Sequence, residues 1–402
     1  MNIGLLSFEY PPETGFGGIG TYTWYHARAL VKLGHRVTVL AGATKTTELR
    51  SEEHDGVVVW RYRSDNGWMR AAEKLGAFQL WWSRNRLENG ASMCEGLNRL
   101  LDKHRFDVIE MPECGAEGLF IDPRKIHVPT VVKLHSPAKL IMPWYDVRGM
   151  DRWLCPQFER LGMRRATGYT SCSEFLADEA HRRLGIKVNI PVIPNGIDVE
   201  LFDDQTHIDV RKKYDVARDQ LVILFCGRME RRKGFHLCLD IVDAIIKNYP
   251  VTFLFAGQDT FKHMVNDFLP ALDQTNAPGS VRYIGRLDQA EVRSCIRQCD
   301  VFLMPSMWEN CPYSCLEAMV AGRAIVASNV GGLPELVVDN ETGSLASNEG
   351  PESFVTALAR LIEDSALRER LGTSARRFIE TTFRDTIVAR RAVQYYEAVG
   401  SE

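Results

Sequence analysis

The sequence lacks any apolar run that approaches the roughly 18–20 residues a membrane-spanning helix needs. It also lacks a surplus of charge: its 402 residues carry a formal net charge of −3, which gives no electrostatic reason to bind nucleic acid. Met1–Leu6 contains no basic residue and precedes Glu9 closely, so it does not resemble a signal peptide, and we expect a cytoplasmic protein. The length exceeds one ordinary core and predicts two domains of about 150–200 residues each.

Zinc knuckles of the CxxC type are missing, although the chain contains ten cysteines. Two CxxxC pairs, Cys295/Cys299 and Cys311/Cys315, lie in apolar stretches without a nearby histidine. Because free cysteine packs like a small hydrophobic side chain, we expect reduced thiols in the core and no metal site.

Short apolar runs alternate with amphipathic segments, such as Thr21–Leu33 and Leu237–Asn248, along the whole chain. This alternation predicts α/β domains with parallel sheets and right-handed crossovers. The turn-rich segment 193–198 is the expected break, so we predict domains over 1–195 and 196–380, followed by a helical segment over 381–402. A cleft between the carboxyl ends of the two sheets would bind ligands. The expected strands are Ile3–Phe8, Arg36–Ala41, Val57–Trp60, Val108–Glu110, Thr130–Leu134, Tyr169–Ser171, Leu221–Cys226, Val251–Ala256, Val281–Ile284, Val301–Met304 and Ala324–Ala327.

The glycine-rich segment 15–20 formally matches the G-x-G-x-x-G motif of dinucleotide-binding proteins. Residues 9–14 separate these glycines from the first strand, and no Asp or Glu ends the second strand to bind a ribose. We therefore do not expect a nicotinamide cofactor. Gly17 and Gly18 can instead bring backbone N–H groups close to a phosphate or a sugar at a helix start; a plain turn is the alternative.

Two cations follow the first strand of the second half. Arg228 stands directly after Leu221–Cys226, and Lys233 stands where the next helix begins. A planar guanidinium and an ammonium suit a diphosphate. The neighbouring Arg231 and Arg232 fit an ordinary solvated basic turn better.

A pair of carboxylates follows the strand Val301–Met304. Glu309 lies in the loop after it, and Glu317 lies about one turn into a helix whose first turn suits Pro312. The N–H groups near Cys311–Ser314 would face an anion. Carboxylates accept hydrogen bonds from the hydroxyl groups of sugars and ribose. Apolar neighbours predict that Glu317 is buried and needs a partner.

These segments together resemble the retaining GT-B glycosyltransferases of family 4 (glycosyl transferases group 1), a family that includes sucrose-phosphate synthases and bacterial mannosyltransferases. The resemblance implies two doubly wound Rossmann-like domains facing a central cleft, with the last helix crossing back to the first domain. It covers nearly the whole chain and rests on the E-x7-E spacing of Glu309 and Glu317 and on the segments Gly227-Arg228, Lys233-Gly234, Asp300–Ser306, Gly331–Glu335, Pro194–Asp198 and Gly17–Gly20.

The resemblance implies transfer of a hexose, with UDP-glucose as the first candidate donor, to an acceptor hydroxyl with retention and without a metal, in cell-surface or exopolysaccharide synthesis. Arg228 and Lys233 would hold the diphosphate and Glu317 the ribose. Glu309 would face the sugar, either as a nucleophile or as a positioning and electrostatic group. The other positions that it implies at the donor are Gly17, Gly18, Leu287, Asn310, Cys311, Pro312 and Tyr313.

His135 would lie near the anomeric carbon according to the same resemblance; by itself, a histidine at a strand end is often only a packed residue. One departure concerns Glu309–Pro312, where many members have Glu-Gly-Phe-Gly. Because proline donates no N–H, a neighbour would have to supply one phosphate contact.

Two other functions stay open: a sugar-nucleotide epimerase on the same fold, and a non-catalytic protein that binds nucleotide sugars. The acceptor would be a sugar or a lipid-linked sugar. The segment Trp68–Leu87 is rich in aromatic and basic residues. It would contact anionic lipid, or else belong to a core helix or to a helix of the acceptor site. We therefore expect a cytoplasmic protein, possibly associated with the membrane.

Overall fold

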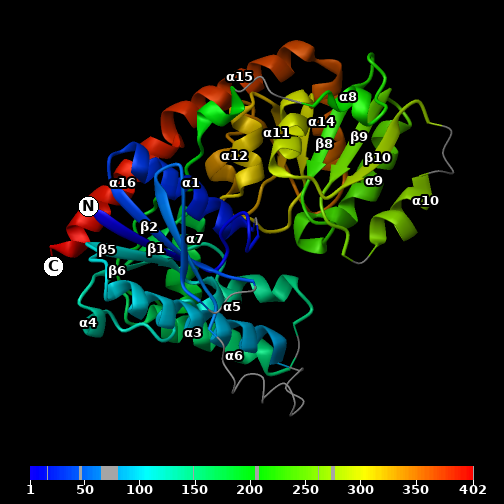
Figure 1. The fold of residues 1–402 in the computed structure, drawn as a ribbon. Coiled ribbons are helices and arrows are strands. Elements are labelled where there is room, and N and C mark those ends of the chain that lie inside the picture. The colour runs from blue at the N-terminus through cyan, green and yellow to red at the C-terminus, as the bar shows by residue number, and fades with distance from the viewer. Residues whose placement is uncertain are drawn as a thin grey trace. The chain divides into compact units, whose positions relative to one another are not determined.

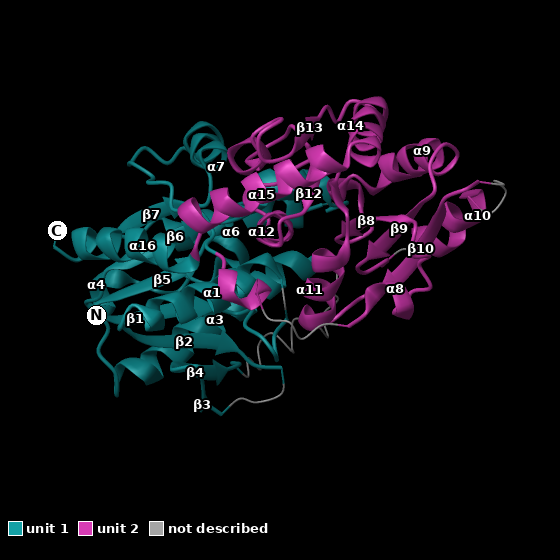
Figure 2. Ribbon diagram, turned by 90° about the horizontal axis from the view of Figure 1, so that it is seen from above, with its two compact units in different colours: residues 1–196, 385–402 teal, residues 197–384 magenta. Residues whose placement is uncertain are grey.

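The computed structural model describes residues 1–15, 17–44, 48–64, 80–147, 149–203, 208–260, 262–272 and 277–401. The chain forms two compact α/β units (Figures 1 and 2). Unit 1 comprises Met1–Gly196 and Asp385–Glu402, and unit 2 comprises Ile197–Arg384. The first boundary between the units lies one residue after the predicted end of the first domain at 195. The second lies four residues after the predicted end of the second domain at 380, since residues 381–384 belong to unit 2.

Unit 1 contains a seven-stranded sheet in the order β3-β4-β2-β1-β5-β6-β7. All neighbouring strands are parallel except β3, which pairs antiparallel with β4. The sequence analysis missed β3 because its residues are polar and mostly exposed, so it lacks the apolar run that marks a buried strand. The strands are β1 (Asn2–Ser7), β2 (Arg36–Gly42), β3 (Arg50–His54), β4 (Val57–Tyr62), β5 (Val108–Pro112), β6 (Thr130–Leu134) and β7 (Gly168–Ser171).

The last helix of the chain, α16, packs on α1 within unit 1. Val388, Ala389 and Tyr396 of α16 join the same apolar core as Ala27 and Leu30 of α1. The helices of unit 1 are α1 (Gly18–Lys32), α3 (Trp81–Leu101), α4 (Pro123–Ile126), α5 (Ala138–Ile141), α6 (Asp151–Met163), α7 (Glu174–Glu179) and α16 (Asp385–Gly400).

Unit 2 contains a six-stranded parallel sheet in the order β10-β9-β8-β11-β12-β13. Strand β13 was not predicted, since three residues give too little pattern to recognise. The strands are β8 (Leu221–Cys226), β9 (Val251–Ala256), β10 (Ser280–Gly285), β11 (Val301–Met304), β12 (Ala324–Ser328) and β13 (Ser344–Ala346); the helices are α8 (Val210–Lys213), α9 (Phe235–Ile246), α10 (Leu269–Leu272), α11 (Gln289–Gln298), α12 (Tyr313–Val320), α13 (Leu333–Leu336), α14 (Glu352–Glu363) and α15 (Ser365–Thr382).

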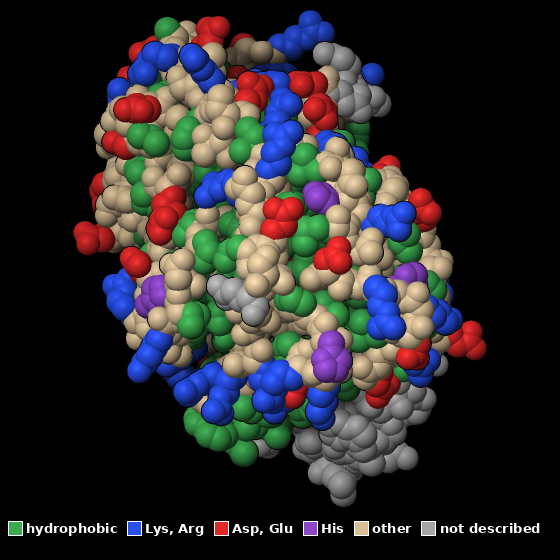
Figure 3. All heavy atoms as spheres, turned by 90° about the vertical axis from the view of Figure 1, so that its left-hand side faces the viewer, with side chains coloured by type: hydrophobic (Ala, Val, Ile, Leu, Met, Phe, Trp, Pro, Cys, Tyr) green, Lys and Arg blue, Asp and Glu red, His purple; other side chains and the backbone are tan. Residues whose placement is uncertain are grey.

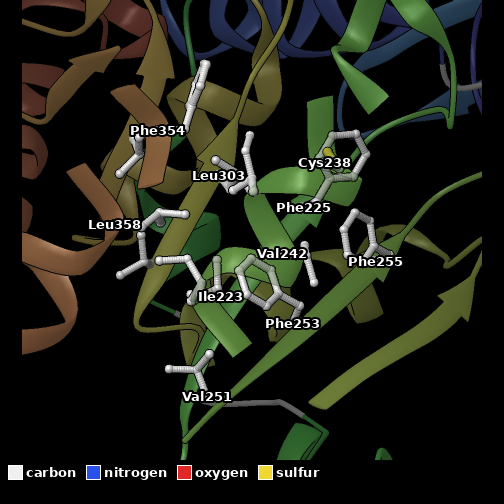
Figure 4. Packing of buried hydrophobic residues seen from close by; sticks show 14 of the residues in the cluster. Ile223, Phe225, Cys238, Val242, Val251, Phe253, Phe255, Leu303, Phe354 and Leu358 are labelled. Atoms are coloured by element: carbon white, nitrogen blue, oxygen red, sulfur yellow. The ribbon is translucent and has the colours of Figure 1, made fainter. Parts of the chain in front are cut away.

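The core of unit 2 places β8 and β11 side by side. Ile223 and Phe225 of β8 and Leu303 of β11 are buried with Val242 of α9 and Phe354 of α14 (Figure 4). Because β8 and β11 are parallel neighbours, their carboxyl ends lie next to each other, and so do the loops that follow them.

The predicted burial of the two CxxxC pairs is confirmed. Cys295, Cys299, Cys311 and Cys315 are buried, and all are free thiols. Acidic and basic side chains are interspersed over most of the face seen in Figure 3. Within the described ranges, no helix has both the length and the apolar character that crossing a bilayer requires.

Candidate functional site

The loops after β8 and β11 contact each other through their backbones. The N–H of Met307 donates to the carbonyl oxygen of Arg232 at 2.8 Å. Gly234 has a positive φ of 73°, and a Cβ atom there would lie 1.7 Å from the carbonyl oxygen of Pro305. Only glycine allows both features, so it brings the basic loop against the loop that carries Glu309.

Glu309 is buried and accepts three charged or polar contacts. Its Oε1 atom lies 2.5 Å from Nζ of Lys233 and 3.0 Å from Oγ of Ser306, and its Oε2 atom lies 3.5 Å from Nη1 of Arg232. Burial by itself would raise the pKa of Glu309, but the positive charges of Lys233 and Arg232 outweigh it and lower that pKa. Glu309 is therefore ionised at neutral pH.

A pair of glycines holds the backbone of Glu309. The N–H of Gly332 donates to its carbonyl oxygen at 3.0 Å. Gly331 has a φ of 59°, and a Cβ atom there would lie 2.0 Å from the same oxygen. The Gly331-Gly332 turn thus packs directly on Glu309, which explains why glycine stands at this turn.

Glu317 lies on α12 and is buried, as predicted. No donor among the described residues forms a hydrogen bond with its carboxyl group. Burial raises the pKa of Glu317 to about 7, and Arg293 opposes this effect. A buried carboxyl group without a protein donor is suited to accept hydrogen bonds from a ligand.

Arg232 is the clearest correction to the sequence analysis, which assigned it to a solvated turn. It is buried, and it contacts Glu230 at 3.1 Å besides Glu309. Arg228 is the more exposed of the two, with 48% of its side chain accessible, and lies 3.2 Å from Glu230. Arg228 and Lys233 both belong to the loop after β8, and Lys233 contacts Glu309.

The remaining predicted positions of unit 2 fall into two places. Asn310, Cys311 and Tyr313 are buried around the start of α12. Pro312 is the N-cap of that helix and not part of its first turn, since α12 begins at Tyr313. Leu287 is half-buried in the turn between β10 and α11, at the edge of the sheet, two strands away from β8.

His135 follows β6 in unit 1 and is buried. Its backbone N–H donates to the carboxyl group of Glu113 at 2.9 Å, and its ring meets the ring of Tyr22 edge-on at 4.7 Å. Burial, with the nearby charge of Lys133, lowers the pKa of His135 well below its usual value. The imidazole is therefore neutral at physiological pH.

Tyr22 links His135 to a buried carboxylate. The hydroxyl group of Tyr22 donates to Oε1 of Glu110 at 2.7 Å, and that of Tyr396 donates to Oε2 at 2.7 Å. Nε2 of His26 lies 2.9 Å from the Tyr396 hydroxyl. The network connects β5, α1 and α16 within unit 1. It was not predicted because its hydrogen-bonded members are up to 370 residues apart in the chain.

Gly17 and Gly18 lie at the start of α1, as expected for a helix entry. A Cβ atom on Gly17 would lie 2.0 Å from Oε2 of Glu9, whereas one on Gly18 would meet no atom within 4 Å. Because the Glu9 carboxylate is the far end of a flexible side chain and can turn away, this contact alone does not require glycine at 17. Phe16, the residue before them, lies outside the described residues.

Comparison with known proteins identifies the family of the chain. Residues 207–378 match the family model for glycosyl transferases group 1, and residues 16–201 match that for glycosyltransferase family 4. A D-inositol 3-phosphate glycosyltransferase of Paenarthrobacter aurescens is 31% identical over 410 residues, covering 97% of this chain and 95% of the relative.

Two solved structures show the same fold. Sucrose-phosphate synthase of Thermosynechococcus elongatus superposes with a TM-score of 0.77 at 20% identity, covering 100% of this chain and 99% of that one. HepE of Anabaena, in complex with UDP-glucose, superposes with a TM-score of 0.69 at 17% identity, covering 99% and 100%. The chain belongs to glycosyltransferase family 4 and is a glycosyl-transferring enzyme of the GT-B fold.

Proposed function

We propose that this enzyme transfers a hexose from UDP-glucose to an acceptor hydroxyl with retention of anomeric configuration, in the synthesis of a cell-surface or extracellular polysaccharide. The observation that carries this proposal is the arrangement at the carboxyl edge of β8 and β11. Ionised Glu309 contacts two cations there, and Glu317 is buried without a donor among the described residues.

Each group has a chemical task in this proposal. Arg228 and Lys233 bind the diphosphate and neutralise the charge that grows on it as the bond to the anomeric carbon breaks. Glu317 accepts hydrogen bonds from the ribose hydroxyls. Glu309 orients the sugar and stabilises positive charge at its anomeric carbon. The acceptor oxygen bonds that carbon on the face from which the diphosphate leaves, and its proton passes to the departing phosphate oxygen.

His135 and the start of α1 contribute from unit 1. A neutral imidazole can donate or accept one hydrogen bond with a sugar hydroxyl without repelling the cationic transition state. Gly17 and Gly18 offer backbone N–H groups to the phosphates or the acceptor. Two cations and a helix start supply the charge that a divalent metal would otherwise supply, so we propose that the reaction needs none.

The donor and acceptor rest on the relatives. HepE of Anabaena was solved with UDP-glucose, which favours this donor over GDP-mannose and UDP-GlcNAc. The names of the relatives include an inositol phosphate glycosyltransferase and a sucrose-phosphate synthase, so we propose only the class of acceptor: a sugar or a lipid-linked sugar. We further propose a cytoplasmic enzyme that contacts the membrane peripherally.

One experiment separates this proposal from its rivals. The protein is incubated with UDP-glucose, GDP-mannose and UDP-GlcNAc in turn, with and without a chelator, and NMR follows the products. Release of UDP from UDP-glucose with an α-linked product, unaffected by chelator, is the expected result. An isomerised nucleotide sugar would identify an epimerase, binding without turnover would identify a binding protein, and activity that returns only with added metal would refute the metal-free mechanism.

A further inference from the structure

A cavity of about 530 Å³ lies along α6 in unit 1, and the proposed transfer uses none of its lining residues. Its lining includes residues of α6, the segment 184–188 and Tyr169 of the edge strand β7. We call this cavity the α6 groove.

The α6 groove carries positive charge that the protein does not balance. The only acidic lining residue, Glu159, is buried and already bonded to Arg86 at 2.7 and 3.0 Å. None of the five cations has an ion-pair partner among the described residues, and one of them, Lys139, donates to a backbone carbonyl. The exposed cations that line the groove are Lys139, Arg152, Arg160, Arg164 and Lys187.

The same groove exposes large apolar side chains. Trp153 and Val188, which line it, are 64% and 54% exposed; Met150, the N-cap of α6, and Leu161 of α6 are 61% and 52% exposed. Exposed apolar side chains that gather beside polar ones often mark an interaction site.

We propose that the α6 groove binds the phosphate headgroup of an anionic phospholipid at a bilayer surface, with Trp153 and Val188 entering the boundary between headgroups and acyl chains. Cations around an apolar wall match a ligand that is anionic at one end and apolar at the other. A free phosphate would fill little of the cavity and gain nothing from its apolar wall. The inference gives the membrane contact of the proposed function a surface, and its test does not depend on transfer.

The test is co-sedimentation of the full chain with vesicles. One set contains phosphatidylcholine alone, and the other contains one-third phosphatidylglycerol. The groove variant combines Arg152→Glu, Arg160→Glu and Arg164→Glu. The control variant, with the same change in net charge, combines Arg36→Glu, Lys103→Glu and Arg105→Glu, which are exposed in unit 1 outside the groove. Thermal unfolding reports whether each variant is folded.

The wild type and the control variant should bind the anionic vesicles and leave phosphatidylcholine unbound. Because each cation near such a surface contributes about fivefold in affinity, the groove variant should lose binding by well over tenfold. Absent binding by the wild type, or equal binding by the two variants, would overturn the proposal.

A second comparison tests the apolar half of the groove. Trp153→Ala should weaken vesicle binding several-fold, whereas Phe120→Ala, another exposed aromatic change in unit 1, should not. Equal effects of both changes would refute the insertion of Trp153. Calorimetry with soluble glycerol phosphate completes the test: affinity equal to that for vesicles would mean that the groove binds a free phosphate and not a bilayer. Donor cleavage, measured separately, reports on the proposed transfer alone.

Discussion

The ammonium nitrogen of Lys233 lies 2.5 Å from Oε1 of Glu309, and the two side chains are only 17% and 7% exposed. Each residue has a proposed role at the donor, yet without donor they neutralise each other. A diphosphate that binds Lys233 must compete with Glu309 for it. In the proposed mechanism, the ion pair would therefore set both the affinity for the diphosphate and the position of the carboxylate.

Glu309→Gln should separate binding from turnover. Without the competing carboxylate, Lys233 and Arg232 attract the diphosphate more strongly, so the dissociation constant of UDP should stay equal or fall several-fold. Loss of the charge that faces the sugar should lower kcat by about 100-fold or more. Calorimetry and donor turnover measure the two effects. Glu341→Gln, an exposed carboxylate of unit 2, is the control, and full turnover of Glu309→Gln would contradict the assignment.

Arg228→Ala should weaken UDP binding by about tenfold, the value of one charge-assisted hydrogen bond. Arg231→Ala removes an exposed cation of the same loop and should change the affinity by less than about threefold. Isothermal calorimetry compares the two. An unchanged affinity of Arg228→Ala would remove this residue from the diphosphate site.

The raised pKa of Glu317, about 7, predicts a pH dependence of nucleotide binding. Below that pKa the carboxyl group is protonated, and above it the carboxylate can accept from both ribose hydroxyls. UDP affinity should therefore rise about tenfold from near pH 6 to near pH 8. UDP itself titrates in this pH range. The Glu317→Gln variant, measured at the same pH values, therefore shows how much of the pH dependence of the affinity comes from UDP alone. Identical pH profiles of the two proteins would contradict the ribose assignment.

Through Glu317, the stability of the protein should fall with rising pH, the opposite of the trend expected for UDP affinity. Because its pKa is raised on folding, the folded state holds a proton that the unfolded state has released between about pH 4.5 and 7. Its contribution to stability is present below the unfolded pKa and is lost as the pH rises through about 7. Thermal unfolding measured against pH should show a smaller loss of stability between about pH 4.5 and 7 for Glu317→Gln than for the wild type. An equal pH dependence of the two proteins would disprove the raised pKa of Glu317.

Gly234→Ala should destabilise unit 2 more than Gly285→Ala. Both glycines have nearly equal φ angles, 73° and 72°, but a Cβ atom at 285 meets nothing within 4 Å. In both variants an alanine must adopt a left-handed backbone conformation, which costs about 1 kcal/mol of folding free energy. Only at 234 does the clash with Pro305 add to this cost. Denaturant unfolding measures the difference, and UDP affinity should fall with Gly234→Ala because the Lys233 loop must shift. Equal destabilisation would show that the close approach is unimportant.

Tyr22→Phe and Tyr396→Phe each remove one hydroxyl donor, at 2.7 Å, from buried Glu110. Both should cost about 1–3 kcal/mol of stability. Tyr22→Leu also removes the ring that meets His135, so it should lower kcat well beyond the two phenylalanine variants if His135 acts at the sugar. Steady-state kinetics at saturating donor measures this, and equal kcat values for all three would assign Tyr22 a purely structural role.

Much of the fold follows from local pattern. Ile3, Leu5, Val222 and Leu224 lie in apolar runs that burial in parallel sheets requires, and these runs alternate with amphipathic segments. The polar edge strand β3 and the three-residue β13 carry no such pattern and could not be predicted. Burial of Glu317 was predictable because its helical neighbours are apolar.

The sequence by itself determined the α/β alternation, the order of the two sheets along the chain, and the residue types at the carboxyl ends of the strands. Only the tertiary structure decided which cation meets which carboxylate. Residues 231–233 form a tight 3-10 turn, so consecutive side chains point in different directions, and Arg232 is buried beside Glu309 while Arg231 is exposed. Glu309, the residue that Arg232 and Lys233 contact, lies 76 residues beyond Lys233 in the chain. Only the pairing of β8 with β11 brings Glu309 within contact distance of these two cations.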